Sequence, residues 1–439
     1  MDSVTAHVID PVTEALTDLH RRLGALRDGE VADYIPQLAL ADPDDFGLAL
    51  VSMAGRRYQA GQADTAFTIQ SVSKPFVYAL ALTDLGAQEV LRYVGAEPSG
   101  ESFNAISLKP GTGRPANPMI NAGAIATSAL VRAAGPGERF ERILACLSAF
   151  AGRSLDVDED VYASEAATGD RNRALAYLMR AAGSLEADVD EATDVYFRQC
   201  SVRVTAADLA VMAATLANGG LNPVTGRQVV TEPTATRTLS VMATCGMYEG
   251  AGEWLMNVGL PAKGGVAGGL IAASPARFGV GVYSPPLNSA GNPVRAVAAM
   301  TEMSERFGLH LMHRAALPHV ATVTAAERWE RDGRSVGFVS AQGTLEFTET
   351  EALLNAIREA TPPAPGRVVL DLTAVTGISS GPAVMLAAVL ADLHGQGHRV
   401  AVAAQQALLQ AGEGRPRTWE AFTTREDALA WCEDRSQGA

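Results

Sequence analysis

The stretch Gln70-Ser71-Val72-Ser73-Lys74 holds the only Ser-x-x-Lys spacing in the chain. Three residues apart on a helix, two side chains lie on one face with Cβ atoms about 5–6 Å apart, so the Ser71 hydroxyl and the Lys74 amine can meet. A helix beginning at Ser71 would also favour a developing negative charge there, through its free N–H groups and its dipole. The spacing predicts a serine nucleophile served by a lysine base.

Lysine is scarce in this chain. The 35 basic residues include only three lysines, Lys74, Lys109 and Lys263. Lysine can lose its proton and act as a base, whereas arginine in a protein effectively cannot. As a base, Lys74 needs a pKa lowered from about 10.4 toward 7–8, which burial and a second nearby cation can supply. We expect Lys263 to be that cation and Lys109 to be a solvated surface residue.

Histidine is absent from the middle of the chain. None occurs between Asp28 and Leu309; the histidines are His7, His20, His310, His313, His319, His394 and His398. Chemistry within that interval can use neither a Ser-His-Asp triad nor a histidine-ligated metal. The cysteines are scattered without a CxxC pair, which indicates reduced thiols. We expect no metal and no cofactor.

Lys263-Gly264-Gly265-Val266 stands at the head of a predicted strand. An early Ser-x-x-Lys and a late Lys-Ser/Thr-Gly form the motif pair of penicillin-recognising enzymes and their relatives. Glycines at this place let a strand pass close to a reacting centre. A backbone N–H from this strand, together with that of Ser71, could form an oxyanion hole.

The elements that would position these residues follow from the hydrophobic pattern. A helix is expected to begin near Ser71, with Pro75 in its first turn, and to end at Gly86. The region from about 120 to 245 has helical spacing, and the remaining expected elements are strands at 46–54, 57–67, 263–274 and 278–284 and a helix at 294–307. This order predicts an α+β domain with a mostly antiparallel sheet and a helical lobe.

A second domain is expected near the C-terminus. The predicted division is a first domain at 1–316, a linker at 317–334 and a small α/β domain at 335–439. Alternating short strands and helices indicate the α/β class; the strands are expected at 338–341, 344–347, 368–372 and 400–404 and the helices at 349–360, 382–393 and 425–432.

Composition excludes several classes of protein. The formal net charge of −14 argues against a nucleic-acid partner, which requires clustered Lys and Arg. The N-terminus, MDSVTAHVIDPVTEAL, has no apolar run typical of a signal peptide. The longest apolar stretch, at about 383–390, is far short of the roughly 20 residues that span a bilayer. These features predict a cytoplasmic enzyme without a membrane partner.

Residues 30–310 resemble the serine-dependent glutaminases, which share the β-lactamase-like fold. The matching stretches occur in the family's order and cover most of the domain: ADYIPQLA, QSVSKP, RYVGAEPSG, NPMINAGAI, SEAATGDRN, VMAATLANGG, CGMY and LPAKGGVAGG. The resemblance departs at Gly264, where the family usually has serine. A hydroxyl near Lys74 or Tyr248 is therefore missing, which leaves the role of Lys263 open.

The resemblance implies hydrolysis of L-glutamine to L-glutamate and ammonia through a γ-glutamyl ester on Ser71. Lys74 would take the serine proton, Tyr248 would help pass it to the departing ammonia, and the N–H groups of Ser71 and Val266 would hold the oxyanion. The residues implied to grip the amino-acid end of the substrate are Tyr34, Gln70, Asn121, Glu165, Asn172 and Tyr196. Relatives form dimers or tetramers, so a homodimer or homotetramer is implied as well.

The C-terminal residues, about 335–434, resemble the STAS domain of anti-sigma-factor antagonists and sulfate transporters. The resemblance rests on VVLDLTAVTGISSG, in which the usual Asp-Ser-Ser-Gly appears as Ile378-Ser379-Ser380-Gly381, without the acid. Phosphorylation of Ser379 or Ser380 is one hypothesis, and a helix N-cap is another. The partner of a STAS-like domain is unknown.

Two other functions stay open on the sequence. A penicillin-binding or β-lactamase-like protein should show Ser-Asp-Asn or Tyr-x-Asn between the two lysine motifs, and usually a secretion signal; we find neither. A catalytically idle protein that binds partners through its C-terminal domain is the second. The intact Ser71, Lys74, Glu165 and Tyr248 argue against it.

Overall fold

The computed structural model describes residues 11–99, 106–312, 322–331, 334–406 and 418–433. The chain divides into two compact units, Met1–His313 and Arg314–Ala439. Most of the N-terminal stretch used to judge a secretion signal lies outside the described residues.

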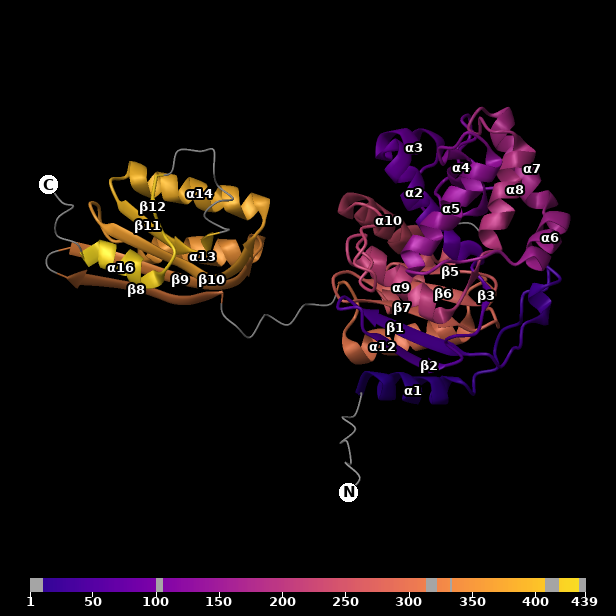
Figure 1. Cartoon of the computed structure of the whole chain (residues 1–439), viewed down its shortest axis with the longest axis horizontal. Coiled ribbons are helices and arrows are strands. Elements are labelled where there is room, and N and C mark those ends of the chain that lie inside the picture. Colours follow the sequence, from indigo (N-terminus) through magenta and orange to yellow (C-terminus); the bar gives the residue numbers. More distant parts are fainter. Residues whose placement is uncertain (1–10, 100–105, 313–321, 332–333, 407–417, 434–439) are drawn as a thin grey trace, which may run out of the picture. The chain divides into compact units, whose positions relative to one another are not determined.

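Among the described residues, the first unit has a five-stranded antiparallel sheet in the order β2-β1-β7-β6-β5 (Figure 1). Its strands are β1 (Gly47–Ser52), β2 (Arg57–Gly61), β5 (Ala262–Gly264), β6 (Gly269–Ser274) and β7 (Phe278–Tyr283). The central pairing joins β1 to β7, so segments far apart in the sequence share one sheet. A separate short pair joins β3 (Phe67–Thr68) to β4 (Arg203–Val204).

Helices cover both faces of this sheet. Helices α1 (Pro11–Leu23) and α12 (Val294–Phe307) share one core with the strands, and α9 (Ala206–Ala217) packs on the opposite face. Close approach of α9 depends on glycine in β7: a Cβ on Gly279 would lie 2.0 Å from the Ala214 nitrogen, and one on Gly281 would lie 2.1 Å from the Ala206 oxygen. The alanine-rich α9 and the glycines of β7 thus bring helix and sheet backbones together.

The helical lobe stands beside the sheet (Figure 1). It is built from α2 (Lys74–Leu85), α3 (Ala87–Tyr93), α4 (Asn121–Leu130), α5 (Pro136–Ala151), α6 (Glu159–Thr168), α7 (Asp170–Ala181), α8 (Val189–Cys200) and α10 (Glu232–Cys245). Helix α11 (Ala251–Asn257) instead belongs to the core that α1 and α12 share with the sheet. Side chains of α4, α7 and α8 form a core of their own. The predicted α+β architecture of antiparallel sheet and helical lobe is confirmed.

Three local predictions for this unit need correction. The strand expected at 57–67 ends at Gly61, and Phe67 belongs to the separate strand β3. The predicted strand 263–274 is a hairpin, since β5 and β6 pair antiparallel around a tight turn. The glycine-rich sequence explains the turn: Gly268 has a φ of 96°, and the Gly265 N–H donates to the Gly269 carbonyl at 2.8 Å. Ser71 lies in the 3₁₀ turn η2 (Gln70–Ser73), directly before α2, rather than in the α-helix itself.

The second unit has, in the described residues, a five-stranded sheet in the order β12-β11-β10-β9-β8. Its elements are β8 (Val323–Arg331), β9 (Arg334–Leu345), α13 (Phe347–Ala360), β10 (Arg367–Ile378), α14 (Ser380–Gly395), β11 (Arg399–Ala404), β12 (Glu420–Phe422) and α16 (Arg425–Glu433). Neighbouring strands are parallel except β8 and β9. Val368 and Leu370 pack toward α13 and α14, whereas Val369 packs toward α16.

Two predictions for this unit were also wrong. Residues 323–331, within the predicted linker, form β8, and the two strands expected at 338–341 and 344–347 are one continuous strand, β9. The edge strand β8, which pairs with β9, carries charged residues such as Glu327 and Glu330. Because such charges are typical of edge strands but also of linkers, the sequence pattern did not predict this strand. Ser379 is at the N-cap position of α14, but its side chain makes no capping hydrogen bond.

No helix of the described residues is long and apolar enough to cross a membrane.

Candidate active site

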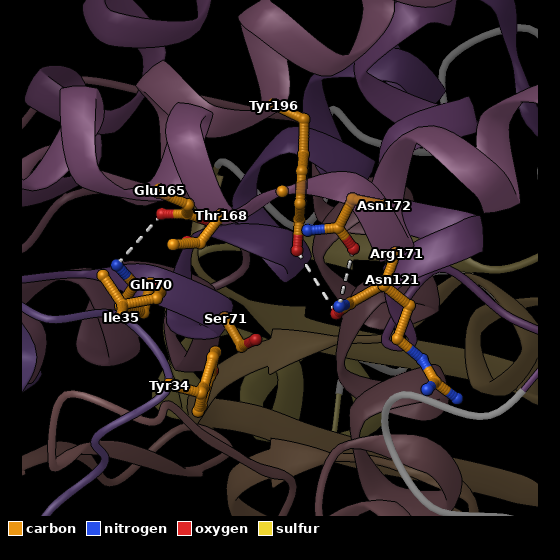
Figure 2. A pocket seen from close by; sticks show the side chains of 11 residues that line it. Tyr34, Ile35, Gln70, Ser71, Asn121, Glu165, Thr168, Arg171, Asn172 and Tyr196 are labelled. Carbon is orange, nitrogen blue, oxygen red and sulfur yellow. Dashed lines mark hydrogen bonds between the residues drawn. The ribbon is translucent and has the colours of Figure 1, made fainter.

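A cavity of about 240 Å³ opens between the η2 turn and the helical lobe (Figure 2). Seven of the candidate residues named from the sequence line it: Tyr34, Gln70, Ser71, Asn121, Glu165, Asn172 and Tyr196. They come from the loop before β1, from η2 and from the helices α4, α6, α7 and α8. Tyr34 is 51% exposed and lies at the mouth, whereas Gln70, Ser71, Glu165 and Tyr196 are buried.

Ser71 and Lys74 meet as their spacing predicted. The Nζ atom of Lys74 lies 2.8 Å from the Oγ atom of Ser71 and 2.7 Å from the Oδ1 atom of Asn121. Asn121 is in turn held by Asn172, whose Oδ1 atom accepts from Asn121 Nδ2 at 3.0 Å, and by the Tyr196 hydroxyl, which donates to Asn121 Oδ1 at 3.3 Å. The cavity wall therefore orients the amine beside the hydroxyl.

Lys74 is poised to lose its proton. Its side chain is 1% exposed, and this burial lowers its pKa to about 8, against smaller opposing contributions from Cys200 and Glu165. Because the acceptor Asn121 Oδ1 is neutral, it binds an N–H of Lys74 without adding a negative charge that would hold the proton. The neutral amine then presents a lone pair to Ser71.

Glu165 is a buried carboxyl among the residues that line the cavity. Gln70 Nε2 donates to Glu165 Oε2 at 3.3 Å, as Figure 2 shows. Burial raises the pKa of Glu165 to about 8, while the hydrogen bond from Gln70 and the charge of Lys74 oppose the shift. A buried carboxyl with so little compensation is suited to a ligand that brings a positive charge.

Backbone strain coincides with the site. Among the described residues, positive φ angles at non-glycine positions occur at Gln70 (48°), Tyr248 (56°) and Ala276 (58°). Gln70 directly precedes Ser71. Tyr248 is the first residue of the short turn η3 (Tyr248–Gly250) and forms a hydrogen bond with Ser71. Conformations of this kind cost roughly 1–3 kcal/mol each and persist only where the surroundings enforce them.

Tyr248 and the end of β5 lie against Ser71 and the η2 turn, although they are not among the residues that line the cavity. The Tyr248 hydroxyl bonds to the Gly264 carbonyl at 3.4 Å; burial raises the pKa of Tyr248, and its hydrogen bond with Ser71 opposes that shift. The chain after β5 runs against the η2 turn, since a Cβ on Gly265 would lie 3.2 Å from the Ile69 oxygen. Val266 follows at once and lines a neighbouring cavity beside β3 rather than the main one.

Lys263, predicted to be the second cation, is not among the groups that shift the pKa of Lys74. It is fully buried, donates to the Gly264 carbonyl at 2.6 Å and lies with Nζ 3.8 Å from the centroid of the Tyr248 ring. Burial and then the charge of Lys74 lower the pKa of Lys263 well below its ordinary value. Burial, and not a neighbouring cation, is what lowers the pKa of Lys74.

The structure adds residues that the motifs did not single out. Ile35, Thr168, Gly169 and Arg171 also line the cavity, and the Arg171 side chain extends away from Gln70 and Glu165 (Figure 2). Three of them lie in the stretch SEAATGDRN, which could have indicated them. Cys200 forms hydrogen bonds with Glu165 and Tyr196, and a single cysteine without a motif gave no signal of that contact.

The described residues contain no group of three His, Cys, Asp or Glu side chains that could hold a metal ion. All four cysteines are free thiols. Lys109 is exposed, as expected for a solvated lysine.

Comparisons with known proteins agree on one family. A family model described as Glutaminase matches residues 29–312. Glutaminase 2 of Bradyrhizobium diazoefficiens is 43% identical over 448 residues, covering 97% of this chain and 71% of that protein. The glutaminase of a Nostoc species is 50% identical over 301 residues, covering 69% of this chain and 90% of its own. The crystal structure of Mglu superposes with a TM-score of 0.81 at 44% identity, covering 91% of this chain and 99% of that one.

Proposed function

Because this chain belongs to the glutaminase family, an amidohydrolase family, we propose that it hydrolyses L-glutamine through a γ-glutamyl ester on Ser71. The observation that supports this route best is the 2.8 Å contact between Ser71 Oγ and the buried amine of Lys74 at the wall of the cavity.

Acylation begins with attack of Ser71 Oγ on the γ-carboxamide carbon of glutamine. Lys74 Nζ takes the hydroxyl proton, and the carbonyl oxygen becomes an oxyanion that the backbone N–H groups of Ser71 and Val266 stabilise. The C–N bond then breaks, and the nitrogen leaves as ammonia with the proton that Lys74 had taken, relayed through the hydroxyl of Tyr248. Lys74 is neutral again after this step.

Deacylation repeats the same chemistry with water. Lys74 takes a proton from a water molecule that attacks the ester carbon, and the collapse of the second oxyanion returns the proton to Ser71 and releases glutamate. One lysine therefore serves both halves of the reaction.

Substrate recognition would rest on opposite charge at Glu165. The α-ammonium group of glutamine would form an ion pair with the Glu165 carboxylate, which the hydrogen bond from Gln70 holds in place. The side chains of Tyr34, Asn121, Asn172 and Tyr196 offer neutral donors for the α-carboxylate.

Ammonia release from purified protein and L-glutamine, beside Ser71→Ala, tests the reaction. We expect ammonia from the wild type and a loss of at least about 10³-fold in the variant. Quenching the wild type with hydroxylamine should yield γ-glutamyl hydroxamate, the trapped acyl group. Undiminished ammonia from Ser71→Ala would refute the nucleophile, and turnover without any hydroxamate would count against the ester.

For the remaining parts of the molecule our proposals rest on resemblance. We propose a homodimer or homotetramer, and a STAS-like binding domain in the C-terminal unit. Light scattering of the full chain tests the first proposal. Intact-mass analysis tests whether Ser379 or Ser380 carries a phosphate.

A further inference from the structure

A buried series of hydrogen bonds runs from the carbonyl of Gln70, a residue in the left-handed conformation, into the helical lobe. The Ser73 hydroxyl donates to the Gln70 carbonyl at 2.7 Å. Gln199 Nε2, on α8, donates to Ser73 Oγ at 2.9 Å, and Ser128 Oγ, on α4, lies 2.7 Å from Gln199 Oε1. Ser73, Gln199 and Ser128 are each fully buried.

The polarity of this series of hydrogen bonds is determined by its proton count. Ser73 has one hydroxyl proton, and the Gln70 carbonyl can only accept, so Ser73 Oγ must itself accept from its other neighbour. That requirement places the amide nitrogen of Gln199 toward Ser73 and its oxygen toward Ser128. Ser128 shares its proton between Gln199 Oε1 and the Ala124 carbonyl, which lies 2.8 Å away. Rotation of the Gln199 amide would set two acceptors against each other, so one arrangement is favoured.

The series of hydrogen bonds ends at Gln70, the residue with the strained backbone conformation. Gln70 has a φ of 48°. Two contacts depend on this angle, because the Gln70 side chain reaches Glu165 and the following residue, Ser71, places its hydroxyl beside Lys74. A change of Gln70 to an ordinary negative φ would move both the Gln70 side chain and the Ser71 hydroxyl away from these contacts. Misplacement of a reacting group by about 1 Å can lower a rate about 100-fold.

We propose that Ser73 and Gln199 are positioning residues, which hold Gln70 in its left-handed conformation and thereby aim Ser71 at Lys74. This inference rests on the proposed role of Ser71 as nucleophile. Gln199 is on α8, the helix that also carries Tyr196 of the cavity lining. The same helix would therefore position both the nucleophile and part of the substrate-binding site.

The central test compares Ser73→Ala with Ser201→Ala. Ser201 is also fully buried, and its hydroxyl donates to the Phe197 carbonyl of α8 at 2.9 Å, with no bond to the η2 turn. Both variants lose one buried hydroxyl and should lose similar thermal stability. We expect kcat to fall about 10- to 100-fold in Ser73→Ala and to stay within about threefold in Ser201→Ala. Equal kcat in the two variants would overturn the proposal.

A second variant covers the case in which Ser73→Ala does not fold. Gln199→Glu keeps the shape of the side chain, but its carboxylate accepts where the amide donated, and it draws the Ser73 proton away from the Gln70 carbonyl. Protonation of the introduced carboxyl restores a donor, so kcat relative to the wild type should fall as pH rises. A ratio independent of pH would contradict the inference. Activity retained in Ser71→Ala would instead refute the nucleophile itself, so the two failures are distinguishable.

Discussion

The carboxamide oxygen of Asn121 lies 2.7 Å from the amine of Lys74, the group that also contacts the hydroxyl of Ser71. This neutral acceptor fixes the direction of the amine without supplying a countercharge. Burial lowers the pKa of Lys74 to about 8, and the amine remains hydrogen-bonded to an acceptor that adds no opposing charge.

The first prediction concerns pH. The neutral fraction of Lys74 grows as pH rises through about 8, so kcat/KM for glutamine should rise over the same window. Asn121→Asp would place a negative charge against the amine and raise its pKa, which should move this rising limb to higher pH. Steady-state assays between pH 6 and 10 provide the measurement. Lys74→Arg, which keeps the charge but cannot act as a base, should be inactive at every pH.

The second prediction concerns Glu165. Glu165→Gln still accepts the hydrogen bond from Gln70 but offers no charge to the substrate ammonium. Since a hydrogen bond to a charged group is worth about 1.5–3 kcal/mol, KM should rise at least about tenfold. An unchanged KM would remove Glu165 from the binding site.

The same variant should be more stable than the wild type at alkaline pH. The pKa of Glu165 is raised from 4.5 to about 8 in the folded protein, so folding retains a proton that the unfolded chain releases above pH 4.5. The wild type therefore loses stability as pH rises from about 5 to 8, and Glu165→Gln does not. Urea unfolding at pH 5 and pH 9 measures this. A stability difference that is the same at both pH values would contradict the raised pKa.

The third prediction compares two substitutions at Gly264. A Cβ there would lie 2.6 Å from Asn292 Oδ1, a buried oxygen that has no hydrogen-bond partner in the described part of the chain. Gly264→Ala should lower the free energy of unfolding by about 1–3 kcal/mol through overpacking. Gly264→Ser should lower it by about 1 kcal/mol less, because its hydroxyl can donate to that oxygen. Equal losses by urea unfolding would mean that the oxygen is not available.

The fourth prediction concerns the two units. Every candidate site residue lies within Met1–His313, and each unit has hydrophobic clusters of its own. A chain ending at His313 should therefore fold and keep kcat/KM for glutamine within about twofold. The full chain is the control. Loss of activity in a truncated protein that is folded by circular dichroism would show that the C-terminal unit supports the site.

The sequence predicted the parts of the site that depend on local spacing. Ser71 and Lys74 meet because they are three positions apart across the η2 turn and the first residue of α2. Helix α12 has the bounds that its amphipathic pattern gave. The prediction of one strand at 263–274 was wrong, because the chain reverses direction near Gly268 and forms the hairpin of β5 and β6. A run of glycine and other small residues does not show where a strand reverses.

Contacts between distant segments were beyond prediction from spacing. Gln199 meets Ser73, and Cys200 meets Glu165, because helices α6 and α8 pack beside η2, and no local pattern encodes such a pairing. The error about Lys263 has the same origin, since the sequence gives a charge but not its burial. The substrate-binding residues came from family resemblance, not from periodicity.

The burial of Glu165 and Gln70 has a consequence for which glutamines can react. These side chains are 5% and 3% exposed, so the proposed binding place of the substrate's amino group is lined by buried side chains. A glutamine inside a protein has an acylated nitrogen, which carries no charge and extends into the preceding residue. In its proposed role, Glu165 would therefore favour the free amino acid over a glutamine within a polypeptide.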